Sequence, residues 1–495
     1  ELWAYAPYNL LPHLKYLTKP NYGAVIADHA HFVDLKPRIF DAKVFADDTD
    51  HPGGWGTILV GGMRLGGGEI SVNADTSGGT DNRTMRSAIF IMDITNPEKE
   101  PKLLLEFTHA NLGFTTAIPA PIVHGSTDSE GTNSKWYLML GSGADTTPAG
   151  FDEVKSTQKG HLFLLDLNNI ASGTGAPLAK EWVLDPLSAN SNVFISDLVP
   201  VDYGLDNFTT DAVYFGTVSG DQSAWGGDLY RVKIQPETGA QQLAVNSWKI
   251  SKVYAAGKPI TAPTSIAYDR RRNRWLLVGS GRFYTKFDNN DSEAYEYYGI
   301  KEKRVPAADN WVTASNLVDI SDTKVAVPAA GVAKEELINP PSMTPSLPTG
   351  ARLRDLEQRM TALTDYVHGW KRVFAAGERN FGGATVLGGT VTYTSFNPDN
   401  NECSLNGQAN LYVVNLATGT AGAGPVIGVD GSSYQDVIDL GSMPATTPSL
   451  HTGTGYKDNG SAKAIIQKAD GSIVTYEEDN SEAVRSGESS WRQLH

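Results

Sequence analysis

The residues of this chain best suited to chemistry lie in a short acidic loop between residues 200 and 212. Asp202 and Asp206 stand at positions one and five of this loop, and Asp211 follows as a later carboxylate. Phe208 lies between them and could donate its backbone carbonyl oxygen. Calcium is bound by hard oxygen ligands at alternate positions of a tight loop, closed by a later acid. The pattern therefore predicts a calcium site formed by Asp202, Asp206, Phe208 and Asp211.

This loop departs from a regular calcium loop in two ways. Position three is Gly204, which has no side-chain ligand, and Asp211 stands at position ten, one residue later than a shortened loop would place its acid. Three carboxylates still suit calcium, and the missing ligand should lower the affinity or let water fill the site. The alternative is an ordinary acidic turn that caps a strand and binds no metal. Both interpretations stay open at this point.

The loop is followed by an apolar run that belongs to a repeated element. In each copy an apolar run ends in glycine or small residues, a loop follows, and a second apolar run closes on Asp, Asn or a charge. The five copies are 57–62 with 88–93, 136–143 with 161–166, 212–217 with 228–233, 275–281 with 297–301, and 390–395 with 410–415. One such strand pair cannot bury its own apolar face, so the copies must stack around a common axis. The sequence therefore predicts an all-β fold, a β-propeller of six to eight blades, about seven.

The segment 303–369 interrupts this pattern. It is rich in Pro, Ala, Val and Ser, and only its last part, from Leu353 to Val367, has apolar residues at helical spacing. We expect a mostly irregular and helical insertion within a single domain that spans residues 1–495. A second short helix is predicted over Leu10–Leu17, and a hairpin over 464–476.

Composition and charge exclude several classes of function. The chain has 495 residues, of which 40% are hydrophobic, with a net charge of −15 and a pI near 5.1. An acidic surface repels phosphate backbones, so nucleic-acid binding is not expected. The lone Cys403 excludes an intrachain disulfide framework, a cysteine-rich zinc site and a haem-attachment motif. No run of about 18 apolar residues is present, so no membrane-spanning helix is expected.

The chain begins without a methionine or a signal peptide, at Glu1-Leu-Trp-Ala-Tyr5, which has the pattern of the interior of a strand. We interpret it as a processed or truncated fragment, with an upstream N-terminal region absent from this chain. The strand at residues 1–5 is predicted to pair with that upstream region, or with a separate polypeptide, which would complete the first blade.

Several motifs, in collinear order, resemble the PilY family, the C-terminal propeller domains of type IV pilus tip-associated proteins. They include Glu1-Leu-Trp-Ala-Tyr-Ala-Pro7, His31-Phe-Val-Asp34, Trp55-Gly-Thr-Ile-Leu-Val-Gly-Gly62, Asp93-Ile-Thr-Asn-Pro97, Gly377-Glu-Arg379 and Ser490-Trp-Arg-Gln-Leu494. The resemblance is weakest over 303–369. It implies a modified β-propeller and places the regulatory calcium loop of the family just before the strand at 212–216. The family positions that match are then Asp202, Asp206 and Asp211.

The resemblance also implies a function. We expect a non-enzymatic pilus tip and assembly factor that supports pilus biogenesis, calcium-modulated extension and retraction, and surface adhesion. The implied partners are minor pilins and the major pilin at the pilus tip, and a host or abiotic surface. The implied location is outside the cell, at the pilus tip, on the cell surface or at the outer membrane.

Two other functions are weighed against this one. A quinoprotein-like dehydrogenase also uses a Trp-rich propeller, but it usually needs two adjacent cysteines to clamp its cofactor, and a single Cys403 cannot supply them. A generic extracellular binding propeller, unrelated to pili, is the other alternative.

Overall fold

The chain is built almost entirely of antiparallel strands. The computed structural model describes residues 3–23, 30–125, 134–145, 154–184, 192–203, 208–235, 242–302, 312–329, 334–362, 367–399, 406–451 and 461–479. Contacts divide the chain into two compact units, residues 1–252 and 253–494. Among the described residues, no helix is both long enough and apolar enough to cross a membrane.

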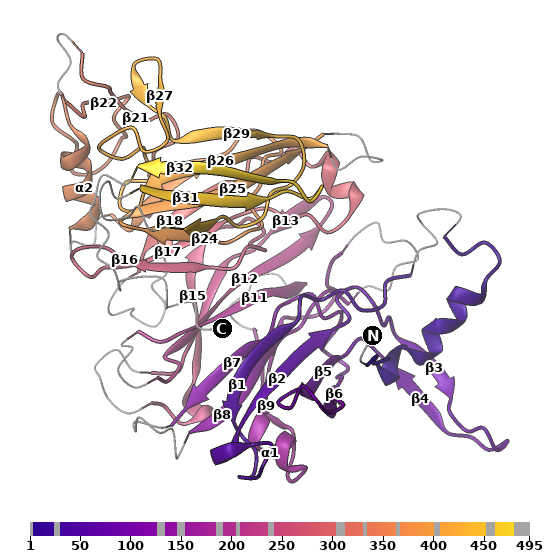
Figure 1. Cartoon of the computed structure of the whole chain (residues 1–495). Coiled ribbons are helices and arrows are strands. Elements are labelled where there is room, and N and C mark those ends of the chain that lie inside the picture. Colours follow the sequence, from indigo (N-terminus) through magenta and orange to yellow (C-terminus); the bar gives the residue numbers. More distant parts are fainter. Residues whose placement is uncertain are drawn as a thin grey trace. The chain divides into compact units, whose positions relative to one another are not determined.

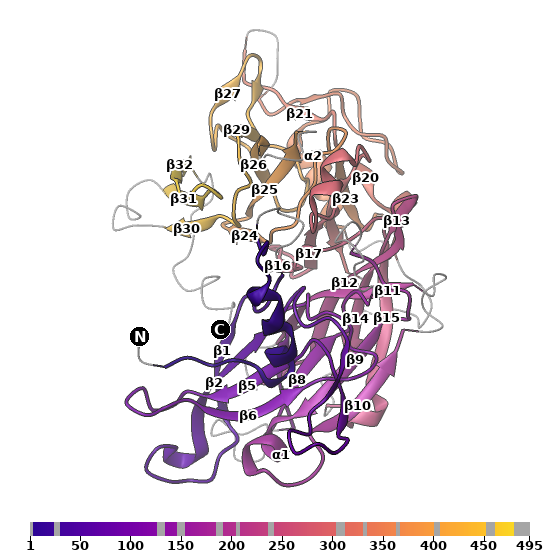
Figure 2. The same ribbon diagram turned by 90° about the vertical axis from the view of Figure 1, so that its right-hand side faces the viewer.

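The first unit contains three large sheets, and a two-stranded one formed by β3 (Ile70–Asn73) and β4 (Asn82–Met85) (Figures 1 and 2). The first sheet has the order β1 (Arg38–Lys43), β2 (Trp55–Gly62), β5 (Ile89–Asp93) and β6 (Lys102–Phe107). The second has the order β10 (Leu178–Val183), β9 (His161–Asp166), β8 (Lys135–Gly141) and β7 (Ala120–His124). The third includes β11 (Val193–Val201), β12 (Ala212–Asp221), β14 (Leu229–Lys233) and β15 (Lys249–Ala255), with β13 (Ala224–Gly226) beside β12 and the short β19 (Val312–Thr313) paired in parallel with the end of β15.

The second unit repeats this arrangement. One sheet has the order β16 (Ser265–Tyr268), β17 (Arg274–Gly279), β18 (Glu296–Lys301), β23 (Gly369–Val373) and β20 (Val318–Asp319). The next has the order β24 (Ala384–Leu387), β25 (Thr390–Pro398), β26 (Gly407–Asn415) and β29 (Val437–Gly441). The last has three strands, β30 (Ser449–His451), β31 (Ser461–Gln467) and β32 (Ile473–Asp479).

Short elements join these sheets. The small strands are β3 (Ile70–Asn73), β4 (Asn82–Met85), β19 (Val312–Thr313), β21 (Lys324–Val325), β22 (Leu337–Ile338), β27 (Val429–Asp430) and β28 (Ser433–Tyr434). The helices are η1 (Tyr8–Thr18), η3 (Pro52–Gly54), η4 (Val245–Ser247), η5 (Lys286–Asn290), η6 (Ala314–Asn316), α1 (Leu167–Ser172) and α2 (Leu353–Thr361).

The all-β prediction is confirmed, and so is the repeated strand pair. The five pairs of apolar runs are the neighbouring antiparallel strands β2 and β5, β8 and β9, β12 and β14, β17 and β18, and β25 and β26. Six sheets of three or more strands lie within the described residues. Closure of these sheets into one ring of about seven blades, in a single domain, stays a prediction.

Within the first unit, alternate side chains of the second sheet enter two different hydrophobic cores. In β8, Leu138 and Leu140 pack with the first sheet in core A, while Tyr137 and Met139 pack with the third sheet in core B. This division follows from the two-residue period of a strand, which sends successive side chains to opposite faces. Core A is completed by residues such as Val60, Ile91 and Phe163, and core B by residues such as Leu164, Ile195 and Phe215.

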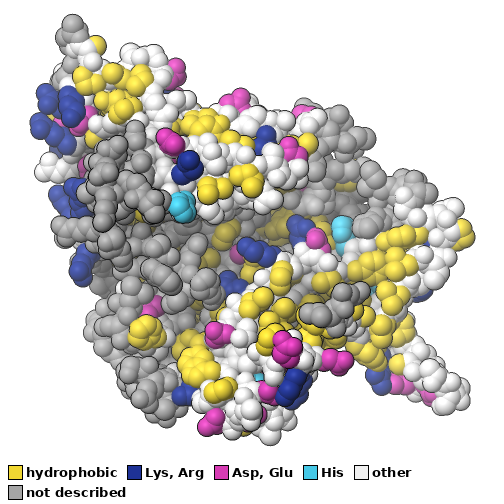
Figure 3. All heavy atoms as spheres, in the orientation of Figure 1, with side chains coloured by type: hydrophobic (Ala, Val, Ile, Leu, Met, Phe, Trp, Pro, Cys, Tyr) yellow, Lys and Arg dark blue, Asp and Glu magenta, His cyan; other side chains and the backbone are white. Residues whose placement is uncertain are grey.

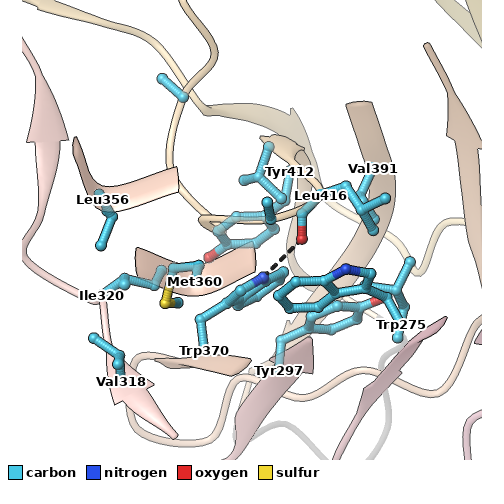
Figure 4. Close-up of a cluster of buried hydrophobic side chains, with 14 of the residues drawn as sticks. Trp275, Tyr297, Val318, Ile320, Leu356, Met360, Trp370, Val391, Tyr412 and Leu416 are labelled. Atoms are coloured by element: carbon cyan, nitrogen blue, oxygen red, sulfur yellow. Dashed lines mark hydrogen bonds between the residues drawn. The ribbon is translucent and has the colours of Figure 1, made fainter. Parts of the chain in front are cut away.

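The second unit is stacked in the same way. In β26, Tyr412 and Val414 enter core C, which they share with the sheet of β17 and β18, while Leu411 and Val413 enter core D with Ala464 and Ile466 of the last sheet. Figure 4 shows the centre of core C. There the Nε1 of the buried Trp370 donates a hydrogen bond of 2.9 Å to the carbonyl oxygen of Leu416.

Two glycines make room for aromatic rings on the neighbouring strand. Gly61 is paired with Phe90, and Gly299 with Trp370. A Cβ atom on either glycine would lie 2.3 Å from the ring of its partner, so a larger residue cannot be accommodated without movement. The absence of a side chain at these positions lets the rings lie flat over the neighbouring strand.

The expectation for the N-terminus was wrong in its secondary structure. Residues 3–7 form no strand, and all four strands of the first sheet come from residues 38–107, so no outside strand is needed to bring it to four. The segment is held instead by Glu106 of β6, whose carboxylate accepts hydrogen bonds from the Tyr5 hydroxyl, the Tyr8 amide, and the Asn9 amide and side chain, at 2.6 to 2.8 Å.

The predicted helix at Leu10–Leu17 is present as the 3₁₀-helix η1. A 3₁₀-helix has three residues per turn, so residues spaced by three lie on one face. Four large side chains at this spacing are exposed, namely Tyr8, Leu11, Leu14 and Leu17. On the face shown in Figure 3, hydrophobic side chains are interspersed with acidic and basic ones.

The insertion at 303–369 is only partly as predicted. Its helix is present as α2, with Leu353, Leu356 and Met360 buried in core C, while Leu363 lies outside the described residues. The rest contributes short strands, of which β20 joins the edge of a sheet by parallel pairing with β23. The insertion therefore takes part in the fold of the second unit. The predicted hairpin at 464–476 is present as β31 and β32.

We predict that Trp370→Ala lowers the free energy of unfolding of the second unit by about 3–5 kcal/mol, because a fully buried indole and its hydrogen bond to Leu416 are lost. The matched control is Ile473→Ala, whose side chain is 66% exposed in the same unit and should change the free energy by less than about 0.5 kcal/mol. Urea denaturation followed by circular dichroism measures both. Equal effects of the two substitutions would show that core C does not stabilise this unit.

Glu478 of β32 makes stability depend on pH. Its side chain is fully buried, and one oxygen accepts a hydrogen bond of 3.0 Å from the hydroxyl of Thr392. Burial raises the pKa of Glu478 to about 7, because the charged form is poorly solvated. The folded state therefore keeps a proton that the unfolded chain loses above its ordinary pKa of 4.5.

We predict that the stability contributed by Glu478 falls as the pH rises from about 4.5 to about 7 and stays constant above that range. Glu478→Gln carries no charge, so the variant should gain stability relative to the wild type over this range, by on the order of 3 kcal/mol at pH 8. Thermal unfolding of both proteins at several pH values measures the difference. A difference that does not change with pH would contradict the prediction.

Candidate calcium loop

The predicted calcium loop connects two antiparallel strands of the third sheet, β11 and β12. The last residue of β11, Val201, is paired with the first residue of β12, Ala212. The backbone amide of Asp211 extends this ladder by donating a hydrogen bond of 2.8 Å to the carbonyl oxygen of Val201. The strand register therefore brings Asp202 and Asp211 to the two sides of the same turn.

Asp211 already has a structural role at this turn. One of its carboxylate oxygens, Oδ2, accepts a hydrogen bond of 2.6 Å from the backbone amide of Tyr203. Its own carbonyl oxygen accepts hydrogen bonds of 2.9 Å from the amides of Ile234 and Gln235, which follow β14. Asp211 therefore caps this turn, as the alternative interpretation expects of an acidic residue here, and its structural role is compatible with either interpretation.

Two carboxylate oxygens of the loop are buried, Oδ2 of Asp202 and Oδ1 of Asp211. They come from the two ends of the loop and are hard oxygen donors of the kind that calcium prefers. The chemistry of this pair therefore fits a divalent cation.

Phe208 has an unusual conformation. Its side chain is 64% exposed, and its φ angle of +53° lies in the left-handed region. Bulky residues rarely adopt this region, and such strain often marks a functional turn. A backbone in this conformation turns sharply, which is compatible with the predicted role of the carbonyl oxygen of Phe208.

The segment after Phe208 is anchored to the second sheet. Thr210 is buried, and its amide donates a hydrogen bond of 2.8 Å to the carbonyl oxygen of Val123 in β7. Its hydroxyl accepts a hydrogen bond of 3.1 Å from the amide of Val123, and its carbonyl oxygen accepts one of 2.8 Å from the side chain of Gln242. The loop is therefore rigidly held at this end.

Part of the predicted site lies outside the described residues, namely Asp206 and Gly204. Within the residues that are described, no group of three or more His, Cys, Asp or Glu side chains is placed to hold a metal ion. Asp202, Phe208 and Asp211 thus belong to one turn, and calcium binding stays a prediction.

Sequence reasoning missed the residues that support the loop. The hydroxyl groups of Tyr203 and Tyr214 are 2.9 Å apart, and Val123 and Gln242 hold Thr210 from distant positions of the chain. A residue about 87 positions away cannot be recognised from local pattern. The pair of threonines before Asp211 is the one feature of the local sequence that could have indicated this anchoring.

Another acidic segment, at 47–50, forms a turn that is satisfied by its own neighbours. Asp48 accepts hydrogen bonds from the amides of Asp50 and His51. The two ring nitrogens of His51 lie 3.0 Å from Asp48 and 2.9 Å from Asp93. These hydrogen bonds account for the acidic side chains of this turn without a metal ion.

Comparison with known proteins gives relatives of one kind. A PilY1 homolog of Xylella fastidiosa (strain Temecula1), described as a type IV pilus biogenesis factor, is 24% identical over 454 residues, which are 86% of this chain and 25% of that protein. A second homolog from the same organism is 25% identical over 310 residues, 61% of this chain and 19% of that protein. PilY1 of Pseudomonas aeruginosa (strain UCBPP-PA14) is 24% identical over 328 residues, 61% of this chain and 24% of that protein.

The chain thus spans about a fifth to a quarter of the length of these curated relatives. No protein-family model matches it. Among solved structures, the intramolecular trans-sialidase from Ruminococcus gnavus covers 93% of this chain and 96% of its own, with 8% identity and a TM-score of 0.30. A score of this size carries no argument about fold or function.

Proposed function

We propose that this chain, a relative of the PilY family of type IV pilus biogenesis factors, acts in type IV pilus biogenesis without being an enzyme. The observation that carries this proposal is the match of 86% of the chain to a relative named as a pilus biogenesis factor. In this role the stacked sheets are a rigid scaffold, and the loops at the strand ends contact other components. The proposed location is outside the cell, at the pilus tip or on the cell surface.

The proposed partners are minor pilins and the major pilin, with adhesion to a host or abiotic surface as a further role. The support is the pilus-related name of the relatives together with an exposed apolar row on η1, because contiguous apolar side chains on a surface often mark a contact with another protein.

We further propose that the loop between β11 and β12 binds calcium. Asp202, Asp206 and Asp211 would supply carboxylate oxygens, and Phe208 its carbonyl oxygen. The support is the pair of buried carboxylate oxygens at the two ends of the loop and the anchoring of Thr210. Calcium would favour the ordered form of the loop, and any partner that binds this form would be bound more tightly in its presence.

We predict that calcium raises the melting temperature of the wild-type protein and that Asp206→Ala abolishes most of this rise. A ligand at 100 times its dissociation constant stabilises a protein by about 2.7 kcal/mol. The matched control is Asp75→Ala, a half-buried aspartate in the turn between β3 and β4, which should leave the calcium response unchanged. Differential scanning calorimetry in calcium, magnesium or a chelator measures these effects. If Asp206→Ala responds to calcium like the wild type, the calcium site is refuted.

The two roles of Asp211 can be separated by a second pair of variants. Asp211→Ala removes the acceptor for the Tyr203 amide, so we predict a loss of about 1–2 kcal/mol even in the chelator. Asp202→Asn should weaken the response to calcium but change the stability in the chelator much less. Identical behaviour of the two variants would mean that the turn has only a structural role.

The pilus role is tested in the organism that encodes this chain. Deletion of the gene should remove or strongly reduce surface pili, counted by electron microscopy of sheared fractions, and the wild-type gene should restore them. Restoration by Asp206→Ala with altered twitching motility would support calcium modulation. Normal piliation in the deletion strain would overturn the pilus proposal without affecting the calcium measurement.

A further inference from the structure

The first unit has an open cavity of about 270 Å³ between the ends of its first and second sheets. One wall is the segment after β1, with Lys43, Phe45 and Asp47, closed by Gly54. The opposite wall consists of Ser134, just before β8, and Asn168 of α1. A cavity of this size is at the small end of ligand sites and can hold about one sugar ring. It is remote in sequence from the calcium loop.

The wall after β1 is rigid because it folds back on itself. The amide of Phe45 donates a hydrogen bond of 3.1 Å to the carbonyl oxygen of Gly54, and the amide of Gly53 donates one of 2.8 Å to Asp47. Gly54 has a φ of +81°, and a Cβ atom there would lie 2.8 Å from the carbonyl oxygen of Phe45. Only glycine permits this close approach of the backbone.

The polar groups of the cavity combine donors and acceptors without a net charge. Lys43 supplies a cation and Asp47 an anion, while Ser134 and Asn168 are neutral groups that can both donate and accept. A polyol has hydroxyl groups that donate and accept in the same way, so this set suits a neutral sugar better than a phosphate or a carboxylate. Asn168 is itself fixed, because its Oδ1 accepts a hydrogen bond of 3.0 Å from the amide of Trp136.

An aromatic side chain stands beside the cavity. Trp55, at the start of β2, is 41% exposed and lies directly opposite Lys43 in the strand register, so both side chains are on the same face of the sheet. A Cβ atom placed on Gly53, which lines the cavity, would lie 3.8 Å from Cδ1 of Trp55, its nearest heavy atom. The ring is held by Trp136 in an edge-to-face contact with centroids 5.9 Å apart. It is therefore a fixed, partly exposed aromatic surface.

We propose that this cavity binds a neutral pyranose sugar, with the ring of Trp55 against the apolar C–H face of the sugar. Lys43, Asp47 and Asn168 would hydrogen-bond its hydroxyl groups. The inference does not rest on the calcium loop or on the pilus assignment. An open cavity of this size, with one stacking ring, is expected to bind single sugars weakly, in the millimolar range.

The test is a titration of the chain with glucose, galactose, mannose and N-acetylglucosamine, followed by saturation-transfer difference NMR. We expect at least one sugar to bind, with the strongest transfer to its ring C–H protons. Trp55→Ala should weaken its binding about tenfold or more, and Trp55→Phe less, because an aromatic surface is kept. Asn168→Ala should also weaken it, without a change in the melting temperature large enough to indicate unfolding.

The matched control is Trp3→Ala, because Trp3 is 46% exposed and, unlike Trp55, has no atom within 4 Å of a Cβ built on the cavity residue Gly53. Its substitution should leave sugar binding unchanged. The proposal is overturned if none of the four sugars binds at concentrations up to about 50 mM, well above the expected dissociation constant. It is equally overturned if Trp55→Ala and Trp55→Phe bind the sugar as the wild type does.

Discussion

The structure depends on the burial of both faces of each central sheet. A strand sends alternate side chains to opposite faces, so a sheet of apolar strands must be covered twice. The second sheet satisfies this requirement by contributing to core A on one face and to core B on the other. The sheet of β25 and β26 does the same with cores C and D. Successive sheets are thereby fixed face to face, which is the packing that a propeller uses for its blades.

This packing explains why the candidate sites lie in loops. The central strands β9 and β18 are buried along their whole length, so they have no surface to offer a ligand. In these central strands, polar groups can meet solvent only beyond the strand ends. The calcium loop joins the ends of β11 and β12, and the cavity lies where β1 ends and β8 begins. Rigid sheets hold both places, so that small loops keep a defined geometry.

The sequence predicted what depends on local pattern and missed what depends on distant contacts. All five strand pairs were predicted, because their apolar runs are long and their partners are close along the chain. The hydrogen bonds from Tyr5 and Asn9 to the carboxylate of Glu106 were not predicted, because about 100 residues separate the partners. The sequence around a glutamate in a strand does not indicate which distant groups it will bind. The same holds for Glu478, whose burial depends on how the last hairpin packs against β25. For the calcium loop, the sequence supplied the acids, whereas the structure showed that one of them also caps the turn.

The proposed dual role of Asp211 is physically consistent, because a carboxylate has two oxygens. Oδ2 holds the Tyr203 amide and thereby fixes the turn, while Oδ1 is buried on the same side chain. Because hydrogen bonds order the two ends of this turn, the binding of an ion there would cost less conformational entropy, which would compensate in part for the ligand missing at position three. The same order limits how far calcium can shift the loop, because an ion can change a population only by its differential affinity for two states. A regulatory role therefore requires that calcium bind two states of the loop with different affinities.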